Sequence, residues 1–209
     1  MKPATIIVSG TDTDVGKTIF AAALAGALGA AYWKPVQAGF DPCGDRETVA
    51  ALSGLPEDCL LPEVYRLSSP CSPHRAAEID GITIDPARLK LPQVSGPLVI
   101  EGAGGVLVPL SDNLLFADVF AKWRKPVVLV ARTALGTINH SLLSIEALRR
   151  RDIPLLGIAF VGDPQPESEA AIVRMGKVRR LGRLPWLDPL DAQTLACAFS
   201  SNFELDEFL

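Results

Sequence analysis

Short runs of hydrophobic residues alternate along this chain with longer segments of helical character. The runs are rich in aliphatic and β-branched residues and lie at positions 5–9, 31–34, 98–101, 127–131, 155–161 and 180–184. Runs of this length without polar alternation are typical of buried parallel strands that helices cover on both faces. The pattern therefore predicts an α/β fold with a doubly wound, mostly parallel sheet of about six or seven strands.

The segments between these runs carry the signals of helices. Ile138, Leu142, Ile145 and Leu148 recur at spacings of three and four and line one helical face. An alanine-rich helix is predicted after residue 18. The proline-rich region from 40 to 96 predicts short helices near Asp45 and after residue 73, laid over the carboxyl edge of the sheet. The last ten residues form an acidic tail with aromatic side chains, to which the pattern assigns no structure.

The composition indicates a single globular domain. The 209 residues fit one domain spanning positions 1–209, and a hydrophobic content of 48% excludes intrinsic disorder as the main state. A net charge of −4 leaves no basic field for nucleic acid or an anionic membrane. The 4 cysteines and 2 histidines form no metal-binding pattern and no disulfide framework. Without a membrane-length apolar run or a signal peptide, we expect a cytoplasmic protein.

A glycine loop follows the first predicted strand directly and reads GTDTDVGKT from position 10 to 18. A strand, a glycine loop, Gly-Lys-Thr and then a helix form the context of a phosphate-binding loop, although five residues rather than four separate the glycines. Backbone N–H groups would converge on phosphate oxygens, Lys17 would add a charge, and Thr18 would offer its hydroxyl to magnesium. A plain strand-to-helix turn remains the alternative, and Asp12 and Asp14 are expected to point away from an anion.

Two further charged residues end predicted strands. Lys34 closes the second apolar run, where a lysine is costly unless an anion lies near, so it is a candidate for neutralising charge in phosphoryl transfer. A lysine that extends to the surface is the alternative. Glu101 ends the third run before a stretch of glycines, at the position where a phosphate-loop protein needs a magnesium ligand. The alternative there is a glycine-rich turn with a capping acid.

The motifs together resemble one enzyme family. GTDTDVGKT, WKPVQAG, IEGAGG, VPLSD with FAD, LGTINH and LPWL stand in the order seen in dethiobiotin synthetases, from Gly10 to Leu187. The resemblance implies one P-loop NTPase-like domain that works as a homodimer with its substrate site at the interface. It also implies closure of the ureido ring of 7,8-diaminopelargonic acid with carbon dioxide or bicarbonate, using ATP and Mg²⁺.

The resemblance assigns roles to matching positions. Lys17, Lys34 and Thr11 are the implied catalytic residues. The implied nucleotide-binding residues are Asp12, Thr13, Asp14, Val15, Gly16, Lys17, Thr18, Pro185 and Leu187. The implied magnesium ligands are Thr18, Asp45 and Glu101, with Glu47 as the alternative to Asp45. The implied substrate-binding residues are Thr11, Lys34, Ala38, Ser72, Gly102, Ala103, Gly104, Gly136, Thr137, Ile138 and Asn139.

Two departures from the family pattern leave questions open. Ala38 stands where many relatives carry a hydroxyl, so one hydrogen bond to phosphate or carbamate is missing or comes from elsewhere. Val161 stands where some relatives place an asparagine that reads adenine, so CTP or another triphosphate is a possible substrate beside ATP. The competing functions are a partitioning-type P-loop ATPase switch, whose signature lysine is absent at Thr11 and Asp12, and a related amide-forming ligase.

Overall fold

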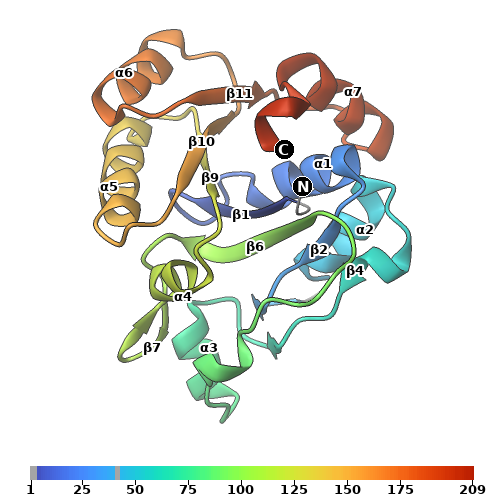
Figure 1. Cartoon of the computed structure of the whole chain (residues 1–209), viewed down its shortest axis with the longest axis vertical. Coiled ribbons are helices and arrows are strands. Elements are labelled where there is room, and N and C mark those ends of the chain that lie inside the picture. The colour runs from blue at the N-terminus through green and yellow to red at the C-terminus, as the bar shows by residue number, and fades with distance from the viewer. Residues whose placement is uncertain (1–3, 41–42) are drawn as a thin grey trace.

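The computed structural model describes residues 4–40 and 43–209, in which a seven-stranded sheet is the central element (Figure 1). Its strands run in the order β11-β10-β9-β1-β6-β2-β4, and all neighbours pair in parallel. Their bounds are β1 Thr5–Gly10, β2 Ala31–Trp33, β4 Leu60–Leu61, β6 Leu98–Gly105, β9 Val127–Arg132, β10 Leu155–Val161 and β11 Arg180–Leu184. Every strand predicted from the sequence is confirmed, and within this sheet β4 is the strand that the sequence analysis missed.

Helices and small sheets surround this core. The helices are α1 Lys17–Leu28, α2 Asp45–Ser53, α3 Pro73–Ile79, α4 Phe116–Trp123, α5 Thr137–Arg149, α6 Pro166–Gly176 and α7 Ala192–Asn202, with short 3-10 turns η1 Glu57–Cys59, η2 Pro86–Arg88 and η3 Leu205–Phe208. Strands β3 (Val36–Ala38) and β5 (Tyr65–Leu67) pair in parallel, and β7 (Pro109–Ser111) pairs antiparallel with β8 (Leu114–Leu115). Across the described residues, no helix has the length and apolarity to cross a membrane.

Alternate side chains of the central strands enter two separate cores. Ile6 and Val8 of β1 pack with α1, α2 and α7, whereas Ile7 packs on the opposite face with α4, α5 and α6. Figure 1 shows α5 and α6 on one side of the β9–β10 pair and α1 and α7 on the other. This arrangement explains the unbroken hydrophobic runs, because both faces of each central strand are buried.

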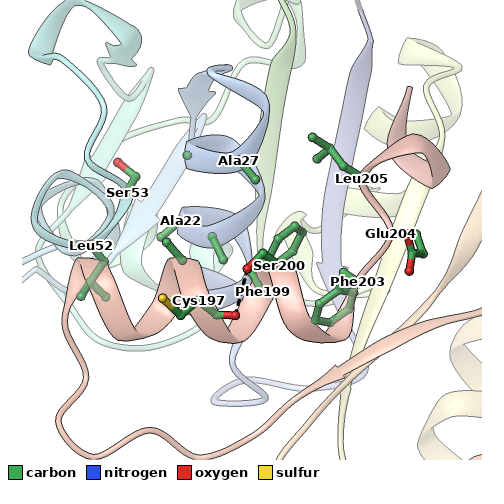
Figure 2. A pocket seen from close by; sticks show the side chains of 13 residues that line it. Ala22, Ala27, Leu52, Ser53, Cys197, Phe199, Ser200, Phe203, Glu204 and Leu205 are labelled. Carbon is green, nitrogen blue, oxygen red and sulfur yellow. Dashed lines mark hydrogen bonds between the residues drawn. The ribbon is translucent and has the colours of Figure 1, made fainter.

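The C-terminal tail is ordered and belongs to one of these cores. Phe203 and Phe208 are buried and lie with Phe199 around the ring of Phe20 on α1. Between α1, α7 and this tail lies a mostly apolar cavity of about 630 Å³, in which Figure 2 shows Phe199 and Phe203. The sequence pattern assigned no structure to this tail. Its aromatic side chains are core residues, which anchor the tail against α1.

The position of Glu101 corrects one expectation. The sequence places this residue at the tip of its strand, but β6 continues through the glycines to Gly105. Glu101 pairs in register with Val8, and after a register shift Gly10 pairs with Gly105. The glycines carry no side chains that would obstruct the loop beside them, so the strand continues through them. Glu101 therefore lies within the sheet and is completely buried.

Helix α4 begins with the FAD segment that the sequence analysis noted. The carboxylate of Asp118 accepts a hydrogen bond from the Leu115 N–H at 2.9 Å and one from Arg151 Nε at 3.0 Å. Partial burial raises the pKa of Asp118, but the Leu115 N–H and the Arg151 guanidinium outweigh this effect, so the pKa of Asp118 lies below its usual value. The ionised carboxylate thus caps the helix.

We expect Asp118→Asn to lower the free energy of unfolding by about 1 kcal/mol at pH 7, the usual size of an N-terminal helix cap. Because folding lowers the pKa of Asp118, its stabilisation is full above the unfolded-state value of 3.8 and is lost as the pH falls through the folded-state value. Urea unfolding of wild type and variant between pH 7 and pH 3 should therefore show the difference shrinking in acid. A constant difference over this range contradicts the assignment, and Asp163→Asn at an exposed site is the control.

Candidate active site

A cleft of about 780 Å³ lies at the carboxyl edge of the sheet, where the phosphate-loop segment, the end of β2 and strand β6 meet. Segments after β3 and β5 form its other side. Most of the predicted site residues line this cleft: Thr13, Asp14, Gly16, Lys17, Thr18, Lys34, Ala38, Asp45, Ser72, Glu101, Ala103 and Gly104. The structure thus brings these residues, which span much of the chain, into one cavity.

The loop between β1 and α1 depends on Gly16 for its shape. Gly16 adopts a left-handed conformation with φ 91°, and a Cβ atom there would lie 2.8 Å from Cγ1 of Val161. Glycine is therefore required both for the backbone angle and for close packing. Its position directly before Lys17, the first residue of α1, leaves the free N–H groups of the helix start beside the cleft.

Lys17 is folded back onto its own loop. Its Nζ donates a hydrogen bond to the backbone carbonyl of Asp12 at 2.8 Å. Burial lowers the pKa of Lys17 to about 8, although the nearby carboxylate of Glu101 acts in the opposite direction. A lysine that is poorly solvated and held by one neutral carbonyl gains more from an anion than a hydrated surface lysine does.

The two aspartates of the loop differ in exposure: Asp14 is exposed, and Asp12 is half-buried. Asp12 Oδ1 accepts the N–H of Thr13 at 2.8 Å, and Asp12 Oδ2 lies 3.9 Å from Arg132 on β9. Asp14 adopts φ 54° within the turn. Asp12 thus serves the turn and the surface, whereas Asp14 lines the cleft and favours the charged form of Lys17.

The centre of the cleft is an ion cluster around Lys34. Lys34 lies just after β2 and is 4% exposed, so it does not extend to the surface. Its Nζ donates to Oε1 of Glu101 at 3.0 Å and to a carboxylate oxygen of Asp45. Burial alone would lower the pKa of Lys34, but the two carboxylates outweigh it and raise the pKa above the usual value. Lys34 is therefore a permanently charged ammonium at the base of the cleft.

Glu101 links this cluster to the phosphate loop. The hydroxyl of Thr18, on the first turn of α1, donates to Oε1 of Glu101 at 2.8 Å, and the Tyr32 hydroxyl donates to Oε2 at 2.8 Å. Burial and the Glu101 carboxylate raise the pKa of Tyr32 well above its usual value, which keeps the phenol protonated as a donor. Both oxygens of the Glu101 carboxylate thus accept hydrogen bonds.

The geometry distinguishes Asp45 from Glu47. Asp45 begins α2 and faces Lys34, whereas Glu47 accepts the Gly44 N–H at 2.9 Å and lies 3.0 Å from Arg66. Gln37, which the sequence analysis missed, accepts the Asp45 N–H and so ties the helix start to β3. The structure therefore directs Asp45 toward the cleft and uses Glu47 as a helix cap.

The donor set suits magnesium that arrives with a phosphate ligand. Two carboxylates and the Thr18 hydroxyl offer oxygen atoms, which Mg²⁺ prefers, and phosphate and water complete such sites. Among the described residues, no group of three or more His, Cys, Asp or Glu side chains could hold a metal ion by itself. A magnesium ion here therefore depends on oxygen ligands from the nucleotide.

Several predicted residues lie outside the cleft of one chain. Within the described part of the chain its lining does not include Thr11, Asp12, Val15, Gly102, Gly136, Thr137, Ile138, Asn139, Pro185 or Leu187. Gly102 is buried against Phe120, and Leu187 packs on the hydrophobic core. Gly136 and Asn139 are exposed at the start of α5. These roles stay predictions.

Trp186 lines the cleft between Pro185 and Leu187, and the sequence analysis did not select it. Its indole is 68% exposed and lies near Gly162, where a Cβ atom would be 3.6 Å from the ring. The carbonyl of Gly162 accepts a hydrogen bond from Arg183 at 2.7 Å. The signal in the sequence was the position of this tryptophan within the LPWL segment, between two residues already assigned to the nucleotide.

Comparison with solved structures finds the same fold in proteins of low sequence identity. The apo McdA structure from Cyanothece matches with a TM-score of 0.56 and 13% identity, over 98% of this chain and 92% of that one. The cell division ATPase MinD of Pyrococcus furiosus matches with a TM-score of 0.50 and 14% identity, over 99% and 98% of the two chains. Identities this low show a shared fold, and the proteins' functions do not transfer.

Comparison with known sequences is far closer. The family model described as AAA domain matches residues 4–194. An ATP-dependent dethiobiotin synthetase BioD of Rhodopseudomonas palustris (strain HaA2) is 64% identical over 204 residues, which are 98% of this chain and 96% of that protein. The protein of the same name from Rhizorhabdus wittichii is 66% identical over 203 residues, 97% of each chain. With the phosphate loop, Lys34 and Glu101 gathered in one cleft, the chain belongs to the ATP-dependent dethiobiotin synthetase family.

Proposed function

We propose that the protein is a cyclo-ligase that converts 7,8-diaminopelargonic acid, carbon dioxide and ATP into dethiobiotin, ADP and phosphate. The observation that carries the proposal is the convergence of Thr18 and Lys34 on one oxygen of the buried Glu101 carboxylate, at 2.8 and 3.0 Å, beside the phosphate loop. This arrangement supplies fixed charges and donors for phosphoryl transfer. The family membership supports the substrates.

The reaction needs three steps, and this chain supplies charge and position in each. One amine of the substrate adds to carbon dioxide and loses a proton, which gives a carbamate. A carbamate oxygen attacks the terminal phosphorus, ADP leaves, and a carbamic-phosphoric mixed anhydride forms. The second amine then attacks the carbonyl carbon, the ring closes, and phosphate leaves. Lys17 and Lys34 stabilise the negative charge that spreads over the transferring phosphoryl group.

Thr18, Asp45 and Glu101 are the residues that would hold magnesium. Bound with the triphosphate, the ion neutralises phosphate charge and helps orient the terminal group. The protein's own contribution is to fix the donors before the nucleotide arrives. Ala38 and Ser72 line the cleft on the side away from the phosphate loop and are proposed to contact the diamine or carbamate.

The proposed reaction can be tested through the coupling of ATP hydrolysis to the other substrates and through the two lysines. We expect triphosphate hydrolysis only when both the diamine and bicarbonate are present, with one ADP released per dethiobiotin. Lys17→Gln and Lys34→Gln should each lower kcat about 100-fold or more, because each removes a charge that stabilises the transition state. A coupled assay of ADP release with product quantification measures both effects.

The control for these variants is Lys90→Gln, which changes an exposed lysine and should leave turnover unchanged. Hydrolysis that proceeds equally without diamine and bicarbonate would instead indicate a partitioning-type ATPase switch. Near-normal turnover in either lysine variant would remove that lysine from the mechanism. Circular dichroism of each variant verifies that it is folded before rates are compared.

We propose that the site accepts nucleoside triphosphates with different bases. Val161 is nearly buried against Gly16 and carries no hydrogen-bonding group in its side chain. Trp186 instead presents an exposed aromatic face at the cleft, and any base can stack on such a face. Affinity then comes mainly from the phosphates.

We therefore expect kcat/KM values for ATP and CTP within about 10-fold of each other, since one missing hydrogen bond to a base is worth about one kcal/mol. Trp186→Ala should raise KM for both nucleotides alike, because stacking does not read the base edge. Initial-rate measurements with each nucleotide at saturating diamine test this expectation. Strict dependence on ATP would contradict it.

A homodimer is proposed from the surface at the start of α5. Leu135 is completely exposed in the turn before the helix, and Leu143 is 56% exposed on it. The Oγ atoms of Thr137 and Ser141 are buried without a hydrogen-bond partner. The segment with the predicted carboxylate-binding residues therefore presents apolar side chains outward, where a second copy would cover them.

We expect the wild-type protein to have twice the 22.3 kDa mass of one chain and Leu135→Asp to be largely monomeric. A charge at this exposed position opposes burial in an interface but does not affect the fold of one chain. Light scattering coupled to size-exclusion chromatography measures the mass, with Leu190→Asp at another exposed leucine as the control. A wild-type monomer at micromolar concentration would rule out the dimer.

A further inference from the structure

Tyr32 occupies an unusual place for a tyrosine. It lies on β2 with no exposed surface, and β2 is flanked by β6 and β4 within the sheet. Its side chain enters the core that faces α1 and α2, and its hydroxyl donates to Oε2 of Glu101 at 2.8 Å. A phenylalanine would fill the same apolar space, so the phenolic oxygen has a role that packing does not explain.

The two oxygens of the Glu101 carboxylate have different partners. Oε1 meets Thr18 and Lys34, which both line the cleft, whereas Oε2 meets Tyr32 inside the core. The phenol therefore fixes the rotation of the carboxylate about its last bond. With Oε2 held in the core, Oε1 stays directed toward the phosphate loop.

We propose that Tyr32 is a positioning residue, which orients Glu101 so that Oε1 is available to a magnesium ion bound with the triphosphate. The inference rests on the proposed function, because it takes Glu101 as a magnesium ligand. Hydrogen bonds that orient metal ligands typically change metal affinity 10- to 100-fold when they are removed. Tyr32 is not among the residues that line the cleft, so it acts on the site through Glu101.

The chain contains a matched control in its second tyrosine. Tyr65 is also buried, and its hydroxyl accepts the Asp85 N–H at 2.8 Å. Both tyrosines thus place a hydrogen-bonded phenol in the protein interior, but Tyr65 bonds to backbone rather than to a carboxylate of the cleft. Tyr65→Phe removes a comparable buried hydroxyl without changing the partners of Glu101.

The first experiment titrates Mg²⁺ into protein with a fluorescent nonhydrolysable ATP analogue and records binding by anisotropy. We expect the Mg²⁺ concentration at half-maximal binding to rise about 10-fold in Tyr32→Phe and to stay at the wild-type value in Tyr65→Phe. Binding of the analogue in EDTA should be the same in all three proteins. A wild-type Mg²⁺ midpoint in folded Tyr32→Phe overturns the proposal.

A second measurement keeps the Tyr32 ring in place. Because the chain has 2 tyrosines, 3-fluorotyrosine incorporated into Tyr65→Phe labels position 32 alone. We expect its ¹⁹F resonance to shift when Mg²⁺ and the analogue are added together, and to shift much less with the analogue in EDTA. A resonance that does not respond to Mg²⁺ overturns the proposal even if Tyr32→Phe fails to fold.

Glu101→Gln separates this inference from the proposed function. If Glu101→Gln keeps the wild-type Mg²⁺ midpoint, Glu101 is not a ligand, and the proposed magnesium site and the role of Tyr32 both fail. If Glu101→Gln shifts the midpoint and Tyr32→Phe does not, only the role of Tyr32 fails. The double variant should show no larger shift than Glu101→Gln alone, because Tyr32 acts through that side chain.

Discussion

The arrangement of the cleft depends on one interaction, the ion pairs of the buried Lys34 ammonium with Asp45 and Glu101. Lys34 connects three segments that are distant in the sequence, because its own position follows β2 while Glu101 lies in β6 and Asp45 begins α2. Two carboxylates this close, one of them fully buried, would repel each other without the cation between them. The location of α2 over the sheet edge is thus set by charge as well as by packing.

The charges of the cleft also constrain how it receives a nucleotide. Two lysines, Lys17 and Lys34, and three acidic residues, Asp14, Asp45 and Glu101, line the cleft, so its formal charge without a ligand is −1. A triphosphate alone would place its negative charges beside these carboxylates. A divalent cation that accompanies it reverses this balance, which gives a physical reason for a metal–nucleotide complex as the species that binds.

The sequence predicted the parts of this structure that have local or periodic signals. The strands that flank Lys34 and Glu101, the loop before Lys17 and the helix after it all follow from residue patterns, and the family resemblance joined them into one site. Strand β4 escaped prediction because two residues have no measurable period. Tyr32 and Gln37 were not predicted as site residues because each forms its hydrogen bond with a residue of another segment. Such a hydrogen bond produces no pattern in the neighbouring sequence.

Strand β1, which carries the phosphate loop, has a further consequence for how the molecule assembles. Thr5 pairs with Leu98, and Ile7 pairs with Val127, so both neighbours of this central strand come from much later in the chain. Such contacts require the closure of long loops before any pairing is gained, and this slows folding. The phosphate loop is the most local motif in the sequence, yet the strand that supports it gains its pairing partners only when segments near residues 98 and 127 come beside it.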